Sequence, residues 1–526
     1  MGSLATALSA LGVLSALINP LWGTCAFVAA LVIRPNEHVE GVLFPVIPTM
    51  VIVMGLVFLL HFVYTGRRLQ MPKAASNRSF LLLMVMLLIL LTHLFIWRRE
   101  EISDWILGEA APAILITLFA MRFMSSPARL AAMFAALGAS AAVIAGQALG
   151  IHFLRKEPMF LVKDKVGDML VSHGALWDSY HLYQNRDEPK TYSVRLQGCR
   201  TGTWGNSNDM AMVCNWGVPV MLYYIRRKGS KLLKAIAAAL MLVLMGTVFL
   251  TGSRGNQMQM GIHFWMIFVG GKRKALGIVL LLIAVVGALV ILPRLSPQRS
   301  DSKASSDERT LLLEDAMRFF IHNPIKGVGF NNFPDLAFRT LMPHNVYAQC
   351  LAETGLIGAS IFFPLIFFRR RETSKSIKYL ETRPDFNLAM LARCIGSLEF
   401  GFFIFMLFSN QFMRFTFALV ISCGMALYFA AIRKQEEEGV AEVKEEAPAE
   451  AVASQAAVYA EVDPDVVPLP PHSPLMLEAH DEGSQGARYV FDPEDPNTGV
   501  RPAGAEEEDE DEPDIEDDPW PRRGRR

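Results

Sequence analysis

The residues that could do chemistry lie in polar turns between long apolar runs. In one turn, Thr251 to Gly255, Arg254 is followed by Gly255 and preceded two residues earlier by Gly252. A guanidinium at the edge of an apolar run is costly without an anionic partner, and its planar fork fits a phosphate or pyrophosphate. Glycine allows the backbone to approach a ligand closely. Arg254 is therefore a candidate phosphate ligand; the alternative is an arginine that extends its guanidinium to the membrane surface.

A second candidate segment, from Glu308 to Gly355, contains a histidine. Gly327 and Gly329 indicate a turn within this segment. His344 lies at the boundary between a polar loop and an apolar run. Histidine has a pKa near neutrality, so His344 could act as a general base toward a hydroxyl group. The alternative is a structural histidine, which is the commoner role at such a boundary.

Other polar residues also lie in or beside apolar runs. Asn208 and Asp209 end the segment that begins at Gly205, and they either cap a helix or line a substrate cavity. Arg393 and Glu399 lie inside one run, where a charge needs a partner. Their spacing of six residues does not put them on one helix face, so we assign them no role beyond structure.

The elements that position these residues are apolar runs of membrane-spanning length. Hydrophobic residues make up 52% of the 526-residue chain, and about 20 apolar residues of helix cross a bilayer. The runs are 42–64, 79–97, 106–124, 127–149, 206–225, 232–251, 256–270, 275–293, 346–369, 386–409 and 413–432. Residues 5–33 are broken at Asn19-Pro20, and we interpret them as one kinked helix, with two short half-spans as the alternative. We therefore predict an all-α transmembrane bundle of about twelve spans.

Basic loops give this bundle a direction. With about twelve alternating spans, the strongest clusters fall on one side, and Lys and Arg prefer the cytoplasm. These clusters are Arg67-Arg68, Arg226-Arg227-Lys228, Lys272-Arg273-Lys274 and Arg369-Arg370-Arg371. The alternation places both termini in the cytoplasm. It places the loops 150–205 and 294–345 and the turn 251–255 outside.

The outer loop 294–345 has the pattern of an amphipathic helix. Ser306 can cap it, and Asn323-Pro324 ends it. Its apolar residues recur at helical spacing at Leu312, Ala316, Phe319 and Phe320. We expect the helix to lie at the outer membrane-water interface above a cavity; the alternative is an ordinary packed surface helix.

The chain divides into a membrane domain, 1–433, and an acidic tail, 434–526. The net charge of -1 averages a basic-looped membrane part and this tail, and it implies no nucleic-acid partner. The tail is rich in Glu, Ala, Pro and Asp, and we predict that it is disordered in the cytoplasm. The 6 cysteines include no CxxC pair, so neither a disulfide framework nor a metal site is expected.

Taken in order, the polar motifs resemble the O-antigen ligase and Wzy-type polymerase superfamily. That family has a Ser-Arg-Gly turn two spans before a large outer loop, an Arg in the loop helix, a Pro-x-x-Gly-x-Gly segment, and a His-Asn pair before a helix with Glu and Gly. The similar region covers about residues 200–370. The matching residues are Gly205 to Asp209, Ser253-Arg254-Gly255, Arg309, Pro324, Gly327, Gly329, His344-Asn345, Glu353 and Gly355.

The resemblance implies a glycosyltransferase at the outer face of the bacterial cytoplasmic membrane. Its donor would be a glycan on undecaprenyl pyrophosphate, and its acceptor lipid A core, another lipid-linked repeat, or a Ser/Thr side chain. No cofactor or metal is implied. His344 would be the base, and Arg254 and Arg309 would stabilise the leaving pyrophosphate. The remaining substrate-binding candidates are Arg195, Arg200, Asn208, Asp209, Gly327, Gly329, Asn345 and Glu353.

Two alternatives stay open at this point. A polysaccharide polymerase of the same superfamily fits the motifs nearly as well as a ligase, which we favour slightly. A polytopic transporter or flippase fits the span count. Transporters often carry repeated halves with broken helices, and the break at Asn19-Pro20 has no counterpart in the second half.

Overall fold

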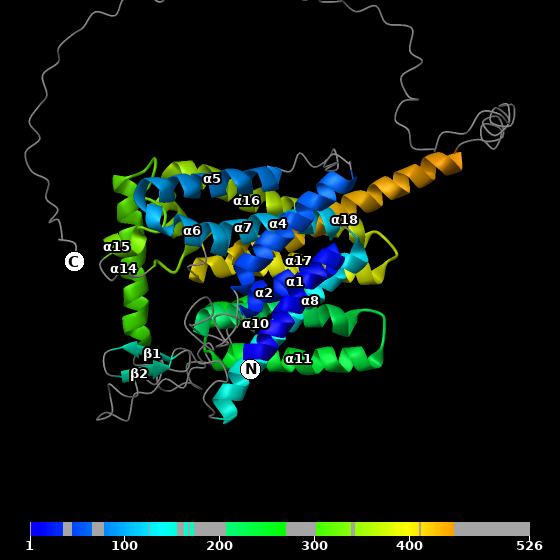
Figure 1. Ribbon diagram of the computed structural model, residues 1–526, viewed down its shortest axis with the longest axis horizontal. Coiled ribbons are helices and arrows are strands. Elements are labelled where there is room, and N and C mark those ends of the chain that lie inside the picture. The colour runs from blue at the N-terminus through cyan, green and yellow to red at the C-terminus, as the bar shows by residue number, and fades with distance from the viewer. Residues whose placement is uncertain are drawn as a thin grey trace, which may run out of the picture. The chain divides into compact units, whose positions relative to one another are not determined.

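The structure is a computed structural model that describes residues 2–34, 45–65, 78–124, 126–154, 163–166, 169–172, 207–269, 301–337, 342–409 and 412–446. Their regular elements are helices, apart from one short antiparallel hairpin in which Lys163 pairs with Ser172 (Figure 1). The elements are α1 (Gly2–Ile18), α2 (Pro20–Ile33), α4 (Val46–Thr65), α5 (Arg78–Trp97), η1 (Arg99–Glu101), α6 (Ile102–Trp105), η2 (Ile106–Ala110), α7 (Ala111–Phe123), α8 (Pro127–Leu154), β1 (Lys163–Val166), β2 (Met169–Ser172), α10 (Ser207–Arg226), α11 (Lys231–Leu250), α12 (Arg254–Val269), α14 (Asp301–His322), α15 (Phe333–Leu336), α16 (Val346–Glu381), α17 (Phe386–Phe405), η3 (Met406–Phe408) and α18 (Phe415–Glu446).

Within the described residues, 7 helical segments are long and apolar enough to cross a membrane. They are Arg78–Trp97, Arg99–Phe123, Pro127–Leu149, Lys231–Leu250, Val346–Glu381, Phe386–Phe408 and Phe415–Glu438. The predicted helical fold with several candidate membrane spans is thus confirmed. The predicted span 275–293 lies outside the described residues, so the count of about twelve stays a prediction.

The buried fraction of each helix shows whether it lies at the centre or at the edge of the bundle. The most apolar stretch of α18 is 89% buried and that of α17 is 72% buried, whereas that of α11 is 22% buried. The side chains of α18 therefore pack against protein on nearly all sides. Those of α11 face outward, where lipid would cover them.

The N-terminal segment is a helical hairpin, which corrects the interpretation of 5–33 as one kinked helix. A Cβ on Gly12 would lie 3.5 Å from the Cβ of Ala26, and a Cβ on Gly23 would lie 2.5 Å from the Cα of Ala16. Residues 12 and 26 would be about 21 Å apart in one continuous helix. Asn19 caps α2 and Pro20 begins it, so the proline starts a new helix instead of kinking an old one. Small residues on both helices allow this close antiparallel packing.

The hairpin changes what the span count implies. It returns the chain to the end of the bundle from which it starts. An N-terminus on the same side as the acidic tail therefore no longer follows from the alternation of spans.

The helix ends form two groups. At the first, Arg98 Nε donates to Asn332 Oδ1 (2.8 Å), and the Phe415 N–H donates to Glu109 Oε2 (2.6 Å). We call this the Arg98 end. It also contains Arg34, whose guanidinium lies over the Phe415 ring at 4.6 Å.

The second group of helix ends lies around Glu372. The Ser79 hydroxyl donates to Glu372 Oε2 (2.9 Å), and the Lys228 N–H donates to Asn387 Oδ1 (2.8 Å). We call this the Glu372 end. These contacts join segments that the basic-loop pattern had assigned to one side.

Two predicted boundaries differ from the structure. α14 begins at Asp301, so Ser306 lies inside the helix instead of capping it, because no Gly or Pro separates the two positions. α18 continues to Glu446, past the predicted domain boundary at 433/434. Good helix formers follow that boundary, and Arg433 pairs with Glu437 one turn on (2.9 Å). The rest of the tail lies outside the described residues.

Candidate functional site

The turn that carries Arg254 is a tight reversal between α11 and α12. Gly252 has a φ of 61°, in the left-handed region, and Thr251 donates its hydroxyl to the Val248 carbonyl (2.7 Å). Arg254 is the first residue of α12, and its side chain is exposed. The free N–H groups at a helix N-terminus favour anions. Both the guanidinium and the helix end therefore suit a negatively charged ligand.

A buried amide network ties this turn to α10. Asn256 Nδ2 donates to the Asn208 carbonyl (2.8 Å) and to Ser253 Oγ (2.9 Å). Asn215 Nδ2 in turn donates to the Asn256 carbonyl (2.6 Å). The structure thus brings the predicted residue Asn208 to the Ser253-Arg254-Gly255 motif. Its neighbour Asp209 is buried, with 6% of its surface exposed.

The Pro-x-x-Gly-x-Gly segment lies against a break in α16. Gly355 has φ 59° and ψ -157°, which interrupts the helix and frees backbone groups on both sides. Four backbone hydrogen bonds use these groups. They run from Val328 N to Ala352 O (2.9 Å), Gly329 N to Glu353 O (3.0 Å), Leu356 N to Pro324 O (2.8 Å) and Ile357 N to Ile325 O (3.1 Å). We call this the glycine lock.

The glycine lock explains the glycines of both motifs. A Cβ on Gly327, at φ +68°, would lie 2.4 Å from the Glu353 carbonyl carbon. A Cβ on Gly355 would lie 2.4 Å from the Ile325 carbonyl oxygen. Gly329 has a φ of +98° and lies against the Trp97 ring. Close backbone packing and positive φ therefore account for Gly327 and Gly329, which were predicted as substrate-binding residues.

Glu353 lies fully buried at the helix break. Its Oε2 accepts a hydrogen bond from Gln349 Nε2 (3.2 Å), whereas its Oε1 has no hydrogen-bond partner among the described residues. Buried carboxylate oxygens are normally satisfied by protein, water or ligand. Glu353 Oε1 is therefore a candidate acceptor for a hydroxyl group of a ligand.

His344 and Asn345 directly precede α16. His344 is half-buried and has a φ of 43°, a strained value for a residue other than glycine. Asn345 is the N-cap, and its Oδ1 accepts from the N–H groups of Tyr347 (3.0 Å) and Ala348 (3.1 Å). The cap accounts for Asn345, and the strained backbone fixes where His344 stands.

The Arg254 and His344 segments meet the same end of α17. A Cβ on Gly255 would lie 3.0 Å from the Cβ of Phe408, in η3. The Tyr347 hydroxyl donates to the carbonyl of Phe403 in α17 (2.7 Å), five residues before Phe408. The C-terminal end of α17 therefore holds both helix N-termini, at the Arg98 end of the bundle.

For the remaining predicted site residues, the structure shows at most the helix on which they lie. Arg309 is exposed on α14, which packs on the first turns of α16 through Leu312, Ala316 and Phe319. Arg195 and Arg200 lie outside the described residues.

A charged cluster at the end of α5 went unpredicted. Besides its bond to Asn332, Arg98 pairs with Glu101 and with Asp335. Glu101 also accepts from Asn331 Nδ2 (2.7 Å). These contacts fasten the loop after Gly329 to α5. The available signal was the run of charges after Trp97, at the end of an apolar segment.

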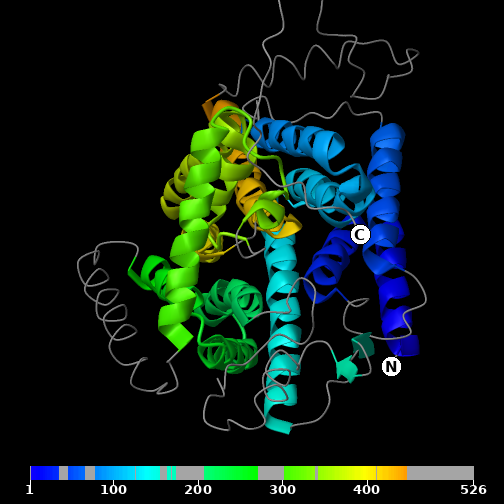
Figure 2. The same ribbon diagram turned by 90° about the vertical axis from the view of Figure 1, so that its left-hand side faces the viewer.

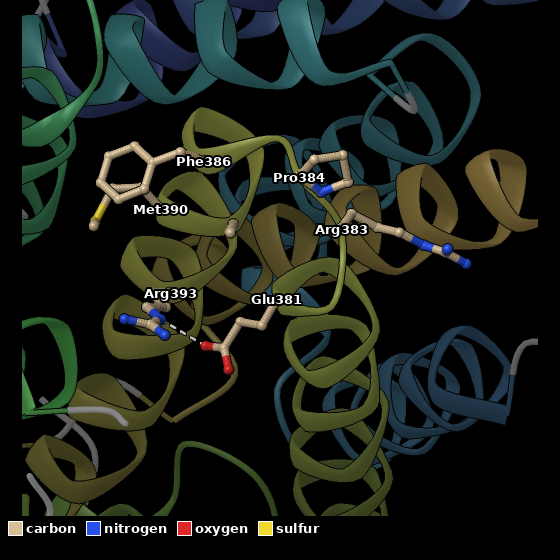
Figure 3. A pocket seen from close by; sticks show the side chains of 7 residues that line it. Glu381, Arg383, Pro384, Phe386, Met390 and Arg393 are labelled. Atoms are coloured by element: carbon tan, nitrogen blue, oxygen red, sulfur yellow. Dashed lines mark hydrogen bonds and ion pairs between the residues drawn. The ribbon is translucent and has the colours of Figure 1, made fainter. Parts of the chain in front are cut away.

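A cavity of about 220 Å³ lies at the opposite, Glu372 end, between α16 and α17 (Figure 3). Its arginine Arg393 pairs with Glu381 across the turn (2.6 Å), and Arg383 pairs with Glu438 (2.6 Å). Because each guanidinium has a carboxylate partner, this cavity offers little attraction to an anion. It is distinct from the Arg254 and His344 segments.

Comparison with known proteins gives one family match. Residues 236–363 match the family model described as O-Antigen ligase. The matched stretch starts within α11 and ends within α16, so it includes the Arg254 turn, α14 and the glycine lock. No curated protein matches the chain.

Proposed function

We propose that this protein is a membrane glycosyltransferase with a lipid-linked donor. The premise is the match of residues 236–363 to the O-antigen ligase family model. The donor would be a glycan on undecaprenyl pyrophosphate, and the acceptor a hydroxyl group. The protein would act in the bacterial cytoplasmic membrane with its Arg98 end outward.

One observation carries the proposal. The motif residues Arg254 and His344 come from helices far apart in sequence, and both helices begin against the same end of α17. A cationic helix N-terminus and a histidine at one end of a membrane bundle fit a donor that has its charge at the membrane surface.

The chemistry is a displacement at the anomeric carbon. The acceptor oxygen forms a bond to that carbon, while the bond from carbon to the pyrophosphate oxygen breaks and its electron pair stays with the leaving pyrophosphate. The acceptor proton passes to the imidazole of His344. Arg254 and Arg309 stabilise the charge that develops on the leaving group, and the α12 N-terminus adds to that field. Arg195 and Arg200 remain candidate helpers.

The remaining motif residues would bind the substrates or hold the site residues in position. Glu353 would accept a hydrogen bond from a sugar hydroxyl through Oε1. Asn208 and Asp209 would hold the Arg254 turn from α10. The glycine lock would keep the loop before His344 in place.

Two substitutions test the proposal. Arg254→Ala removes the cation, and His344→Asn removes the base with a residue that tolerates positive φ. Each should lower glycan transfer in membranes by about 100-fold or more. Arg99→Ala is the matched control, because Arg99 is exposed at the same end and bonds the Phe95 carbonyl (2.9 Å). Full transfer by both variants, at normal protein level, would overturn the proposal.

Ligase and polymerase differ in the product that accumulates. We slightly favour ligase-like transfer, because the matched family model carries the description O-Antigen ligase. Deletion of the protein should then leave full-length glycan chains on the lipid carrier. Single uncapped repeats on the acceptor would indicate a polymerase instead.

A further inference from the structure

α14 has an exposed apolar ridge that faces away from its packing surface. Its inner face, Leu312, Ala316 and Phe319, is buried against α15 and α16. On another face, Leu313, Met317 and Ile321 recur every fourth residue with 40%, 42% and 68% of their surface exposed. Contiguous exposed apolar surface on a helix marks a contact with protein or membrane.

Helix α5 also has an exposed apolar surface. Leu81, Leu88 and Phe95 are 63%, 62% and 56% exposed and seven residues apart, so they form one stripe along α5. Helix α5 is one of the segments apolar enough to span a membrane. Lipid tails are the medium that such a stripe would meet.

The loop that follows α14 lies against Trp97, at the end of α5. Lys326 Nζ lies 5.9 Å from the centre of the Trp97 ring, and Ile325, the next residue back towards α14, is 65% exposed. Tryptophan at the end of a spanning helix, with a lysine beside it, is typical of the membrane-water interface. We therefore place the end of α5, and the loop after α14 that contacts it, at the level of the membrane-water interface.

The orientation of α14 fits a position at the membrane-water interface. Figures 1 and 2 show α14 lying crosswise to the bundle helices and across the end of α16, where it packs. Glu314 is exposed, and the Arg318 side chain is 54% exposed, on the side next to the ridge. A helix with an apolar edge, a charged edge and an axis along the membrane plane has the pattern of an interfacial helix.

We propose that the ridge Leu313, Met317 and Ile321 inserts into the interfacial zone of the lipid bilayer beside α5. Arg309 is one turn before Leu313 in the same every-fourth-residue row, so it stands at the depth of lipid phosphates. That consequence for Arg309 rests on the proposed function; the insertion of the ridge does not.

A fluorescence experiment tests the insertion on the full-length protein in lipid nanodiscs. Met317→Cys and, as its matched control, Arg318→Cys are each labelled with the environment-sensitive fluorophore NBD. Both positions are exposed, so neither change disturbs the core. Labelled wild-type protein gives the background from its native cysteines.

The expected result is a blue-shifted emission from the label at Met317→Cys. Lipids that carry a nitroxide at a shallow depth should quench this emission at least about twofold more than the emission from the label at Arg318→Cys. Equal quenching at both positions would overturn the proposal. A blue shift without quenching would also overturn it, because it would show the ridge covered by protein. The measurement needs no glycan transfer, so its failure is distinct from failure of the proposed enzyme activity.

Discussion

Asn345 shares a motif with His344, but its side chain has a structural task. Its Oδ1 accepts two N–H groups at the start of α16. We predict that Asn345→Ala costs about 1 kcal/mol of stability through the lost cap. Asn345→Ser keeps a cap and should keep most transfer activity. Thermal unfolding in detergent and transfer in membranes measure the two effects.

A different result would reassign Asn345. If Asn345→Ser unfolds like the wild type but loses transfer as strongly as His344→Asn, the side chain contacts substrate as well as the helix start. Asn345→Ala alone could not show this, because it changes the cap and the amide together.

At the scale of residues, the sequence indicated the site through types and order. Arg254 and His344 were found because an arginine or histidine beside an apolar run is unusual. Arg98 was missed, because its partners Asn332 and Asp335 are more than two hundred positions away and no local pattern pairs them. A single sequence shows which charges need partners, and it does not show where the partners lie.

The glycine lock is the element that most depends on backbone shape. A methyl group on Gly355 would enter the space of the Ile325 carbonyl and would also sit at positive φ. We predict that Gly355→Ala lowers stability by more than about 1 kcal/mol. Gly246→Ala is the matched control, because nothing lies within 4 Å of its Cβ position in α11. That variant should unfold no earlier than the wild type, since alanine favours helix.

Thermal unfolding of the two variants in the same detergent compares them directly. Equal midpoints would contradict the glycine lock as a constraint on α16. The sequence predicted a turn from Gly327 and Gly329, but not that the turn pairs with a broken helix. Those hydrogen bonds join backbone to backbone, so side-chain patterns carry no record of them.

A buried ion pair joins α16 to α17. Arg369 Nε lies 3.1 Å from Glu399 Oε1, and both side chains are fully buried. We predict that Arg369→Met destabilises the protein by about 3 kcal/mol, because it leaves a carboxylate buried without its cation. Adding Glu399→Leu should recover most of that loss. Unfolding by a denaturing detergent measures each step.

The surface pair at the same end is the control for this comparison. Arg393 pairs with Glu381 at 2.6 Å, but both side chains are partly exposed. Arg393→Met should therefore cost less than about 1 kcal/mol. Similar losses for Arg369→Met and Arg393→Met would contradict the buried pair as a main tie between α16 and α17. The sequence showed that Glu399 needs a partner, and the structure supplies it from another helix.

At the scale of the whole molecule, loop charges predicted which helix ends share a side. The hydrogen bonds at the Arg98 and Glu372 ends join segments in the same grouping. The span count could not be predicted as well, because an apolar run of about 29 residues fits one long helix or a hairpin. Gly12, Ala16, Gly23 and Ala26 held the signal for the hairpin, since small residues allow two helices to pack closely.

The hairpin leads to a prediction about the two chain ends. α2 ends at Ile33, its C-cap Arg34 lies at the Arg98 end, and α1 lies antiparallel to α2. α18 leaves the bundle at the Glu372 end, where Glu438 pairs with Arg383. Epitope tags on the N- and C-termini should therefore lie on opposite membrane faces, with the C-terminal tag in the cytoplasm by the charge rule. Protease treatment of intact spheroplasts should remove the N-terminal tag and spare the C-terminal one. Protection of both tags would mean that residues 5–33 cross the membrane once, and the hairpin would then be wrong.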